Sequence, residues 1–240
     1  MKFFFLLLLF GFNAQVFSTE PIDVVIACQE RDRRFLDQCI KGVRETIPNV
    51  QKIIVVSKEP YSSSADWFNE NRFPFSRDEM IDEMMKKSPY RSPHKKTPLY
   101  RNPRIEKIFY QLVRLYFCLV IPEISSNVLA IDARAPLNPV KWISETGEPY
   151  FYPVDKETDF SFYQKLLPDL LSTRGMMREN EFSWMFQRPI IEDLLTQFAA
   201  FHRCDAWRGI VKWMEPMSIS QSDFCEYDLY HWFYLLRSMR

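Results

Sequence analysis

Glycine is scarce in this sequence, and its scarcity excludes several kinds of ligand site. The 240 residues include five glycines, and no two of them lie close together. Loops that cradle phosphate need clustered glycines, because the backbone must approach the anion closely. The chain accordingly has no GxGxxG loop and no GxxxxGK[ST] loop, and it also lacks the GxSxG turn of serine hydrolases.

Histidine and cysteine are also sparse, and the chain has no excess of one charge. There are three histidines without an HExxH zinc motif, and five cysteines without a CxxC pair, so zinc-ribbon and thioredoxin-type motifs are excluded. An odd, low cysteine count is not that of a disulfide scaffold, although one or two bridges stay open. Basic and acidic residues number 31 each. A formally neutral chain gives no reason to expect a nucleic-acid partner.

The first residues are typical of a targeting segment rather than of a folded domain. Lys2 precedes an apolar run over residues 3–12, and the residues near Ser18 suit a cleavage site. The run is too short to cross a bilayer as a helix, which needs about 20 apolar residues. We expect residues 1–18 to be a signal peptide or a short membrane anchor. The domain would then be exported or periplasmic, or stay N-terminally anchored, and no other segment approaches transmembrane length.

Short apolar runs rich in β-branched residues alternate with helical patterns in the rest of the chain. Residues 23–28 and 52–57 are typical of buried strands, and residues 34–44 between them carry apolar side chains four apart. Two strands joined through a helix are expected to be parallel. A third buried strand over 128–131 ends at Asp132. This order predicts one α/β domain with a mostly parallel central sheet flanked by helices.

The remaining segments extend this prediction. Helices are predicted over 104–119, 160–171, 189–198, 206–214 and 222–237, and strands over 150–152 and 182–186. Residues 58–103 interrupt the pattern with six prolines around one helix, which Ser76 and Glu79 begin with a capping box. We interpret this Pro-rich segment as a lid or insert with few long-range apolar contacts.

Polar and charged side chains cluster where a ligand is expected to bind. In open α/β sheets, ligands bind outside the carboxyl ends of the strands. Two clusters follow predicted strands, a third lies near the C-terminus, and two further polar residues share one face of the helix at 104–119. The candidate residues are Asp32, Gln111, Arg114, Asp132, Arg134, Glu226 and Tyr227.

Five segments occur in a fixed order along the chain: IDVVIAC, WFNENRFPF, IFYQLVRLYF, LAIDARAPLNP and SDFCEYDLYHWF. This series resembles a bacterial family of proteins with the nucleotide-diphospho-sugar transferase (GT-A type) fold. Members carry a motif like Tyr-Gln-Gln-x-x-Lys-Leu-Tyr on a helix, then an Asp-x-Asp strand end, and Ser-Glu-Tyr-Glu-x-Tyr near the C-terminus. The resemblance covers about residues 22–237. It implies a single Rossmann-like GT-A domain that transfers a sugar from a nucleotide-sugar donor to a carbohydrate acceptor.

The resemblance also implies roles for the matching residues. Gln111 and Arg114 match the helix motif, with Arg114 in place of lysine, and Glu226 and Tyr227 match the C-terminal motif. Glu226 is expected to act on the acceptor hydroxyl as a base or positioning group. Tyr227 and Gln111 would bind substrate, and Arg114 would offset the diphosphate charge. Asp32, in the loop after the first strand, is a candidate nucleotide contact.

One position departs from the family pattern. Families of this fold use the second acid of Asp-x-Asp to hold a divalent cation, Mn²⁺ or Mg²⁺, and that position is Arg134 here. Asp132 alone remains as a metal ligand or a contact to the donor ribose. Arginine cannot ligate a metal, but it can bind the diphosphate directly. The chain is therefore a transferase with Arg134 in place of the metal, or an inactive nucleotide- or carbohydrate-binding relative. An unrelated secreted interaction protein is a third hypothesis.

Simpler interpretations of these residues stay open at this point. Asp132 is typical of a turn that ends a strand, and Arg134 suits a solvated surface position. Asp32 near a helix start is favourable for the helix dipole.

The candidates on helices have simpler interpretations as well. Gln111 and Arg114 fit a polar stripe that faces solvent, and Glu226 fits an exposed acid in the first turn of a helix. His231 is more typical of a helix surface than of a metal ligand.

Overall fold

The structure of the protein, a computed structural model, covers most of the chain after residue 20. It describes residues 21–86, 102–135, 144, 147–149, 160–168, 170, 183–214 and 224–238. The expected signal segment at 1–18 and the predicted strand at 150–152 lie outside these residues. Within the described part of the chain, no helix has both the length and the apolar character that spanning a membrane would require.

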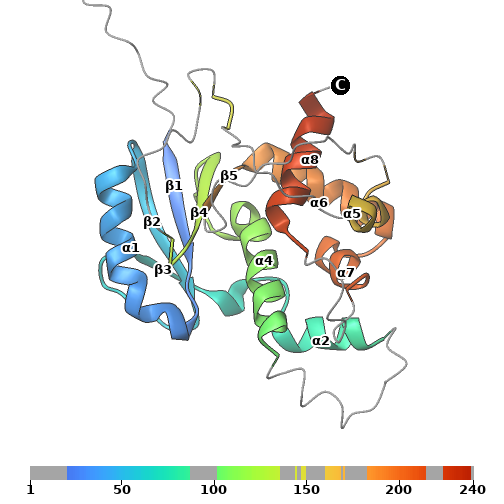
Figure 1. Ribbon diagram of the computed structural model, residues 1–240, viewed down its shortest axis with the longest axis horizontal. Helices are drawn as coiled ribbons and strands as arrows, with labels where there is room; N and C mark the ends of the chain where they lie inside the picture. Colours follow the sequence, from blue (N-terminus) through green and yellow to red (C-terminus); the bar gives the residue numbers. More distant parts are fainter. Residues whose placement is uncertain are drawn as a thin grey trace, which may run out of the picture.

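Five strands form one sheet, in the order β3-β2-β1-β4-β5 (Figure 1). The strands are β1 (Ile22–Ala27), β2 (Val50–Ser57), β3 (Asp66–Asn69), β4 (Asn127–Asp132) and β5 (Ser183–Gln187). The first four run parallel to their neighbours, and β5 is antiparallel to β4. The prediction of an α/β domain with a mostly parallel, Rossmann-like central sheet is therefore confirmed.

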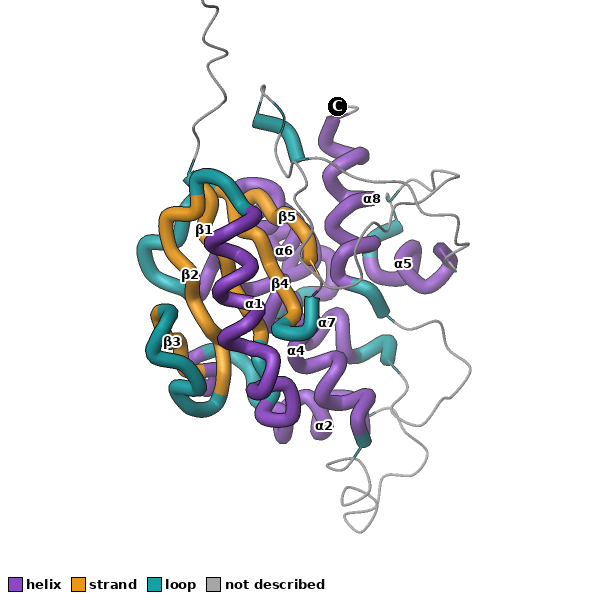
Figure 2. The backbone as a smooth tube through the Cα atoms, turned by 60° about the vertical axis from the view of Figure 1, so that its left-hand side comes forward, coloured by secondary structure: helices purple, strands orange, loops and turns teal. Residues whose placement is uncertain are grey.

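Helices cover both faces of this sheet. They are α1 (Arg33–Thr46), α2 (Arg77–Met85), α4 (Pro103–Val120), α5 (Phe160–Leu166), α6 (Arg188–His202), α7 (Ala206–Val211) and α8 (Glu226–Ser238). Helix α1 lies over one face, while α4 and the helices that follow it gather on the opposite side (Figures 1 and 2). Each helix predicted from the sequence is present, although α5 ends at Leu166 and α7 at Val211, before the predicted ends at 171 and 214, and α8 begins at Glu226, after the predicted start at 222.

Local signals explain where two of the helices begin. The side chain of Ser76 accepts the Glu79 backbone N–H, and Glu79 accepts the Ser76 backbone N–H in return, so the predicted capping box of α2 is confirmed. Asn102 accepts the Arg104 backbone N–H at 2.9 Å, and Pro103 occupies the first turn of α4. Proline suits this position because its missing N–H would have no partner within the helix.

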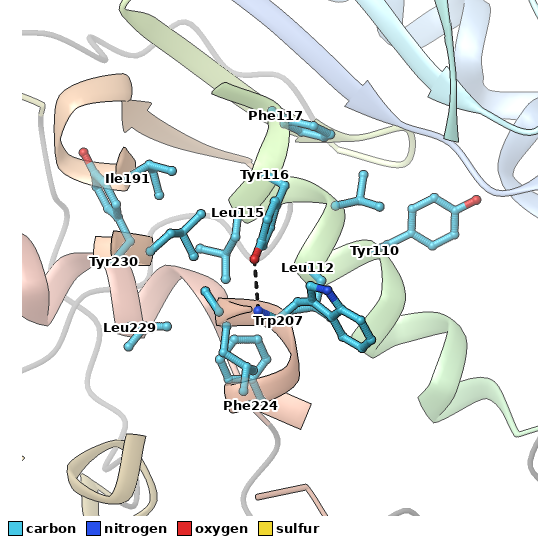
Figure 3. Packing of buried hydrophobic residues seen from close by; sticks show 14 of the residues in the cluster. Tyr110, Leu112, Leu115, Tyr116, Phe117, Ile191, Trp207, Phe224, Leu229 and Tyr230 are labelled. Carbon is cyan, nitrogen blue, oxygen red and sulfur yellow. Dashed lines mark hydrogen bonds between the residues drawn. The ribbon is translucent and has the colours of Figure 1, made fainter. Parts of the chain in front are cut away.

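Side chains of the central strand alternate between two hydrophobic cores. Val24 and Ile26 pack on the α1 side, whereas Val25 and Ala27 join the larger core on the α4 side. Figure 3 shows this larger core, in which the Tyr116 hydroxyl accepts the Trp207 backbone N–H at 3.0 Å. That bond ties α7 to the central helix α4.

The sequence predicts that residues 58–103 form a lid or insert with few long-range apolar contacts. For the residues described by the structure, this prediction of few apolar contacts is wrong. The described part of this segment, 58–86, contributes β3 to the sheet and buries aromatic and methionine side chains in the larger core. Phe75, for example, lies edge-on to Tyr116 with ring centroids 5.2 Å apart. The described prolines Pro60 and Pro74 therefore do not prevent the side chains of this segment from packing.

A polar network fastens the same segment to α4. Arg77 donates to Glu70 at 2.8 Å and makes two hydrogen bonds to Glu106, at 2.6 and 3.0 Å. The Tyr110 hydroxyl donates to the other oxygen of Glu70 at 2.7 Å. Glu70 is 3% exposed, so its carboxylate has exchanged water for these two donors. We refer to these four residues as the Arg77 network.

The close packing of α6 on α7 gives a first prediction, on stability. A Cβ added at Gly209 would lie 2.8 Å from Cδ2 of His202, whose Nε2 is held 2.9 Å from the Leu166 carbonyl. We expect Gly209→Ala to lower the free energy of unfolding in urea by about 1–3 kcal/mol, because the His202 ring would have to shift away from its contacts with the Leu166 carbonyl and the Phe198 ring. In a His202→Ala background the same substitution should cost little; an equal cost there would contradict the steric explanation.

Candidate functional site

The order of the strands creates a crevice between β1 and β4. From β1 the chain proceeds to β2 and β3 on one side, then returns to β4 on the other side of β1. Such a switch point in the strand order is where open α/β sheets bind ligands, and we refer to the space outside the carboxyl ends of β1 and β4 as the crevice. Ala27 at the end of β1 is in register with Asp132 at the end of β4. The two predicted strand-end clusters thus meet at one place.

Arg134 lies between two carboxylates at this crevice. Its guanidinium donates to both oxygens of Asp132, at 3.1 and 3.2 Å, and its backbone N–H also donates to Asp132, at 2.9 Å. The Arg134 Nε is 3.6 Å from a carboxylate oxygen of Asp32. The structure therefore brings Asp32 next to Asp132 and Arg134, which lie 100 and 102 positions further along the sequence.

The pKa values of Asp32 and Arg134 are shifted by partial burial and by the neighbouring charges. Loss of water raises the pKa of Asp32, and Arg134 acts against that rise. Hydrogen bonding to Asp132 raises the pKa of Arg134, so its positive charge is secure at neutral pH. The Arg134 side chain is 43% exposed. A ligand that enters the crevice can therefore reach a fixed cation.

A second group of predicted residues pairs α4 with α8. Arg114 donates through Nε to Glu226, and the two side chains are 12% and 1% exposed. The Arg114 guanidinium also lies over the ring of Tyr227 at 5.7 Å, and Tyr227 stacks on Trp184 with centroids 5.1 Å apart. Burial lowers the pKa of Arg114, but Glu226 and Tyr227 together raise it by more, so Arg114 keeps its positive charge.

The backbone at the start of α8 is held from two sides. Gln111 on α4 donates to the Phe224 carbonyl. The Tyr163 hydroxyl on α5 accepts the Cys225 N–H at 2.9 Å and lies 3.3 Å from the Cys225 carbonyl. Gln111 therefore positions the C-terminal segment and is not aimed at the crevice.

The two groups of residues belong to one electrostatic environment. Asp132 contributes to the raised pKa of Arg114, and Arg114 lowers that of Arg134. Asp132 also contributes to the raised pKa of Tyr227. Asp32, Asp132 and Arg134 thus meet at the crevice, and Arg114 and Tyr227 lie within electrostatic range of Asp132. Gln111 and Glu226 belong to the contacts between α4 and α8.

Three of the simpler interpretations are wrong. Gln111 is 4% exposed and Arg114 is buried, so they do not form a solvent-facing stripe. Glu226 is not an exposed acid, and His231 is 5% exposed rather than on the helix surface. Burial of Glu226 also bears on its expected role. Its carboxylate already accepts from Arg114 and has no access to solvent, so the geometry favours positioning of Arg114 over proton abstraction from an acceptor.

Two residues that support the site were missed by sequence reasoning. Tyr163 makes its hydrogen bonds to backbone atoms of Cys225, which no side-chain motif reveals. Trp184 lies on the strand that was predicted, but its stacking on Tyr227 depends on how β5 and α8 pack. An aromatic residue on a buried strand is by itself typical of a core.

The donor set does not fit a divalent cation. Both carboxylates at the crevice face the Arg134 guanidinium, which competes for their oxygens and repels a cation. Among the residues that the structure describes, no group of three or more His, Cys, Asp or Glu side chains is placed to hold a metal ion.

Comparison of the chain with models of known protein families and with curated proteins finds no match. The likeness to a GT-A family therefore rests on the motifs in the sequence.

The burial of the Arg114–Glu226 pair gives a second prediction. Removing one partner leaves a buried charge uncompensated, so Glu226→Ala should lower the free energy of unfolding by about 3–5 kcal/mol. The double variant Arg114→Met, Glu226→Leu should recover most of this loss in the same urea titration.

The Lys41–Glu45 pair supplies a matched control, because its atoms are 3.8 Å apart and both side chains are exposed. Glu45→Ala should change the stability by less than about 1 kcal/mol. Equal effects of Glu226→Ala and Glu45→Ala would show that burial does not strengthen the pair.

Proposed function

We propose that the protein is glycosyltransferase-like: it binds the diphosphate of a nucleotide-sugar at the β1–β4 crevice and transfers the sugar to a carbohydrate acceptor. The observation that carries this proposal is the meeting of Asp32, Asp132 and Arg134 at the switch point of the sheet. The motif order along the chain supports it independently.

In this proposal Arg134 supplies the positive charge that a bound metal ion would otherwise supply. A diphosphate leaving group gains negative charge as the glycosidic bond breaks, and a guanidinium can offset that charge through two parallel hydrogen bonds. Arg134 is exposed enough to turn from its carboxylates toward phosphate oxygens. Asp132 then becomes available to accept hydroxyl groups of the donor.

The beginning of α1 adds positive charge on the same side. Arg31, Arg33 and Arg34 are exposed around the start of this helix, directly after β1. The positive end of the helix dipole points the same way. Arg114 contributes from below, although Glu226 offsets its charge. An anionic donor is thus favoured over a neutral one at this edge of the sheet.

A second candidate function is binding without turnover, as an inactive nucleotide- or carbohydrate-binding relative. The burial of Glu226 favours it, because the expected catalytic base is tied to Arg114. Release of free UDP from UDP-sugars in the presence of carbohydrate acceptors distinguishes the two. Export through residues 1–18 stays a prediction, which N-terminal sequencing of the mature protein tests.

The proposal predicts that the protein binds UDP without a divalent cation. In calorimetric titrations, Arg134→Ala should weaken UDP binding by about 1.5–3 kcal/mol, or roughly 10- to 150-fold, which is the range for a charged hydrogen bond. Arg188→Ala is the matched control, because its side chain is similarly exposed, at 42%. Arg188 follows the end of β5 that pairs with the amino end of β4, away from the crevice.

The effect of a divalent cation on UDP binding provides the result that could contradict the role of Arg134. Binding by the natural protein should survive a chelator, whereas Arg134→Asp should bind UDP only with Mn²⁺ or Mg²⁺, since it restores a second carboxylate. Loss of natural binding on chelation would overturn the role given to Arg134. Absence of UDP binding by the natural protein with and without cation would remove the nucleotide hypothesis.

A further inference from the structure

A pocket of about 390 Å³ lies beside the crevice, between α1 and the residues that follow β4. Helix α1 contributes Phe35, Gln38 and Gly42 to its lining, with Lys41 and Glu45, and Arg134 lines the opposite side. Sites for small molecules in proteins have volumes of about 300–1,000 Å³, so the pocket is large enough for a sugar unit.

The charges in this pocket compensate one another. Lys41 and Glu45 form an ion pair at 3.8 Å, and Arg134 is paired with Asp132 and Asp32. In the proposed function Arg134 is committed to the diphosphate, so the charges left in the lining are those of Lys41 and Glu45, which offset each other. The lining therefore favours a ligand that is polar but neutral.

The polar groups point to a ligand with several hydroxyls. Gln38 offers both a donor and an acceptor, Glu45 offers acceptors, and Lys41 offers donors. Phe35 adds an aromatic ring, of which Arg34 covers one face at 4.6 Å. Donors and acceptors in a neutral setting beside an aromatic ring suit a polyhydroxylated ring such as a sugar.

Arg134 belongs to both this pocket and the crevice. A ligand in the pocket would thus lie next to a diphosphate held by Arg134, which is where a transfer reaction needs its acceptor. We propose that the pocket between α1 and Ala133–Ala135 binds the neutral carbohydrate acceptor. This inference rests on the proposed function for its catalytic meaning, but the binding of a neutral sugar can be measured by itself.

Gly42 offers a way to close the pocket without unfolding the protein. It lies inside the 14-residue helix α1, where glycine is less favourable than alanine or leucine by about 1 kcal/mol. Gly42→Leu should therefore fill the pocket and leave the melting temperature unchanged or higher. Gly42→Ala is the matched control, because it adds one methyl group and leaves most of the volume open.

The experiment is an NMR titration of the ¹⁵N-labelled protein with a panel of neutral mono- and disaccharides. Each sugar is added to about 50 mM, enough to occupy a site whose dissociation constant is on the order of 1–10 mM. We expect at least one sugar to shift the backbone amides of Gly42, Ala133 and Ala135. Gly42→Leu should weaken that sugar's binding at least tenfold, and Gly42→Ala by less than about twofold.

Three outcomes would overturn the inference. These are no shift with any neutral sugar, shifts confined to residues away from the pocket, or binding of glucose 6-phosphate and citrate in preference to the neutral panel. UDP titration of the same variants separates this inference from the proposed function. Gly42→Leu should leave UDP affinity unchanged, whereas Arg134→Ala should lower it. Sugar binding without UDP binding would support the sugar pocket and contradict the proposed transferase function. UDP binding without sugar binding would contradict the sugar pocket alone.

Discussion

The buried ion pair between Arg114 and Glu226 fixes the C-terminal helix α8 against the central helix α4. Arg114 belongs to α4, which packs under β1 and β4, and Glu226 begins α8 at the far end of the chain. Neither charge has enough water around it to be stable alone, so each requires the other in place. The position of the C-terminal helix behind the crevice, and the stack of Tyr227 on Trp184, depend on this requirement.

The crevice combines rigid support with exposed chemistry. The ends of β1 and β4 hold Asp132 and the turn to Arg134, while Gln111 and Tyr163 hold the backbone at the start of α8. The backbone that carries Asp132 is therefore held in register with the end of β1, while the Arg134 side chain stays exposed. Such preorganisation reduces the conformational freedom that binding would otherwise remove.

Sequence reasoning predicted the sheet and the helices whose hydrophobic patterns are long. It failed where the packing of residues far apart in the sequence determines the structure. The helix at 104–119 and the β-branched strands follow from periodicity, and the rule on strand ends placed Asp32 near Asp132. Strand β3 was missed because four residues, Asp66–Asn69, carry no clear alternation. Burial of Glu226 was missed because acids are mostly exposed, and its partner Arg114 lies 112 positions away.

The Arg77 network has a consequence for motion. If residues 66–86 slid along α4 by one turn, Glu70 would keep Arg77 but lose the Tyr110 hydroxyl, while still out of reach of water. Arg77 would lose Glu106 in the same step. Sliding therefore leaves buried polar groups unpaired, which favours opening of this end of the molecule as one unit. Residues 66–86 and the first turns of α4 would then form one cooperative unit, whose amide hydrogens share one opening free energy in hydrogen exchange.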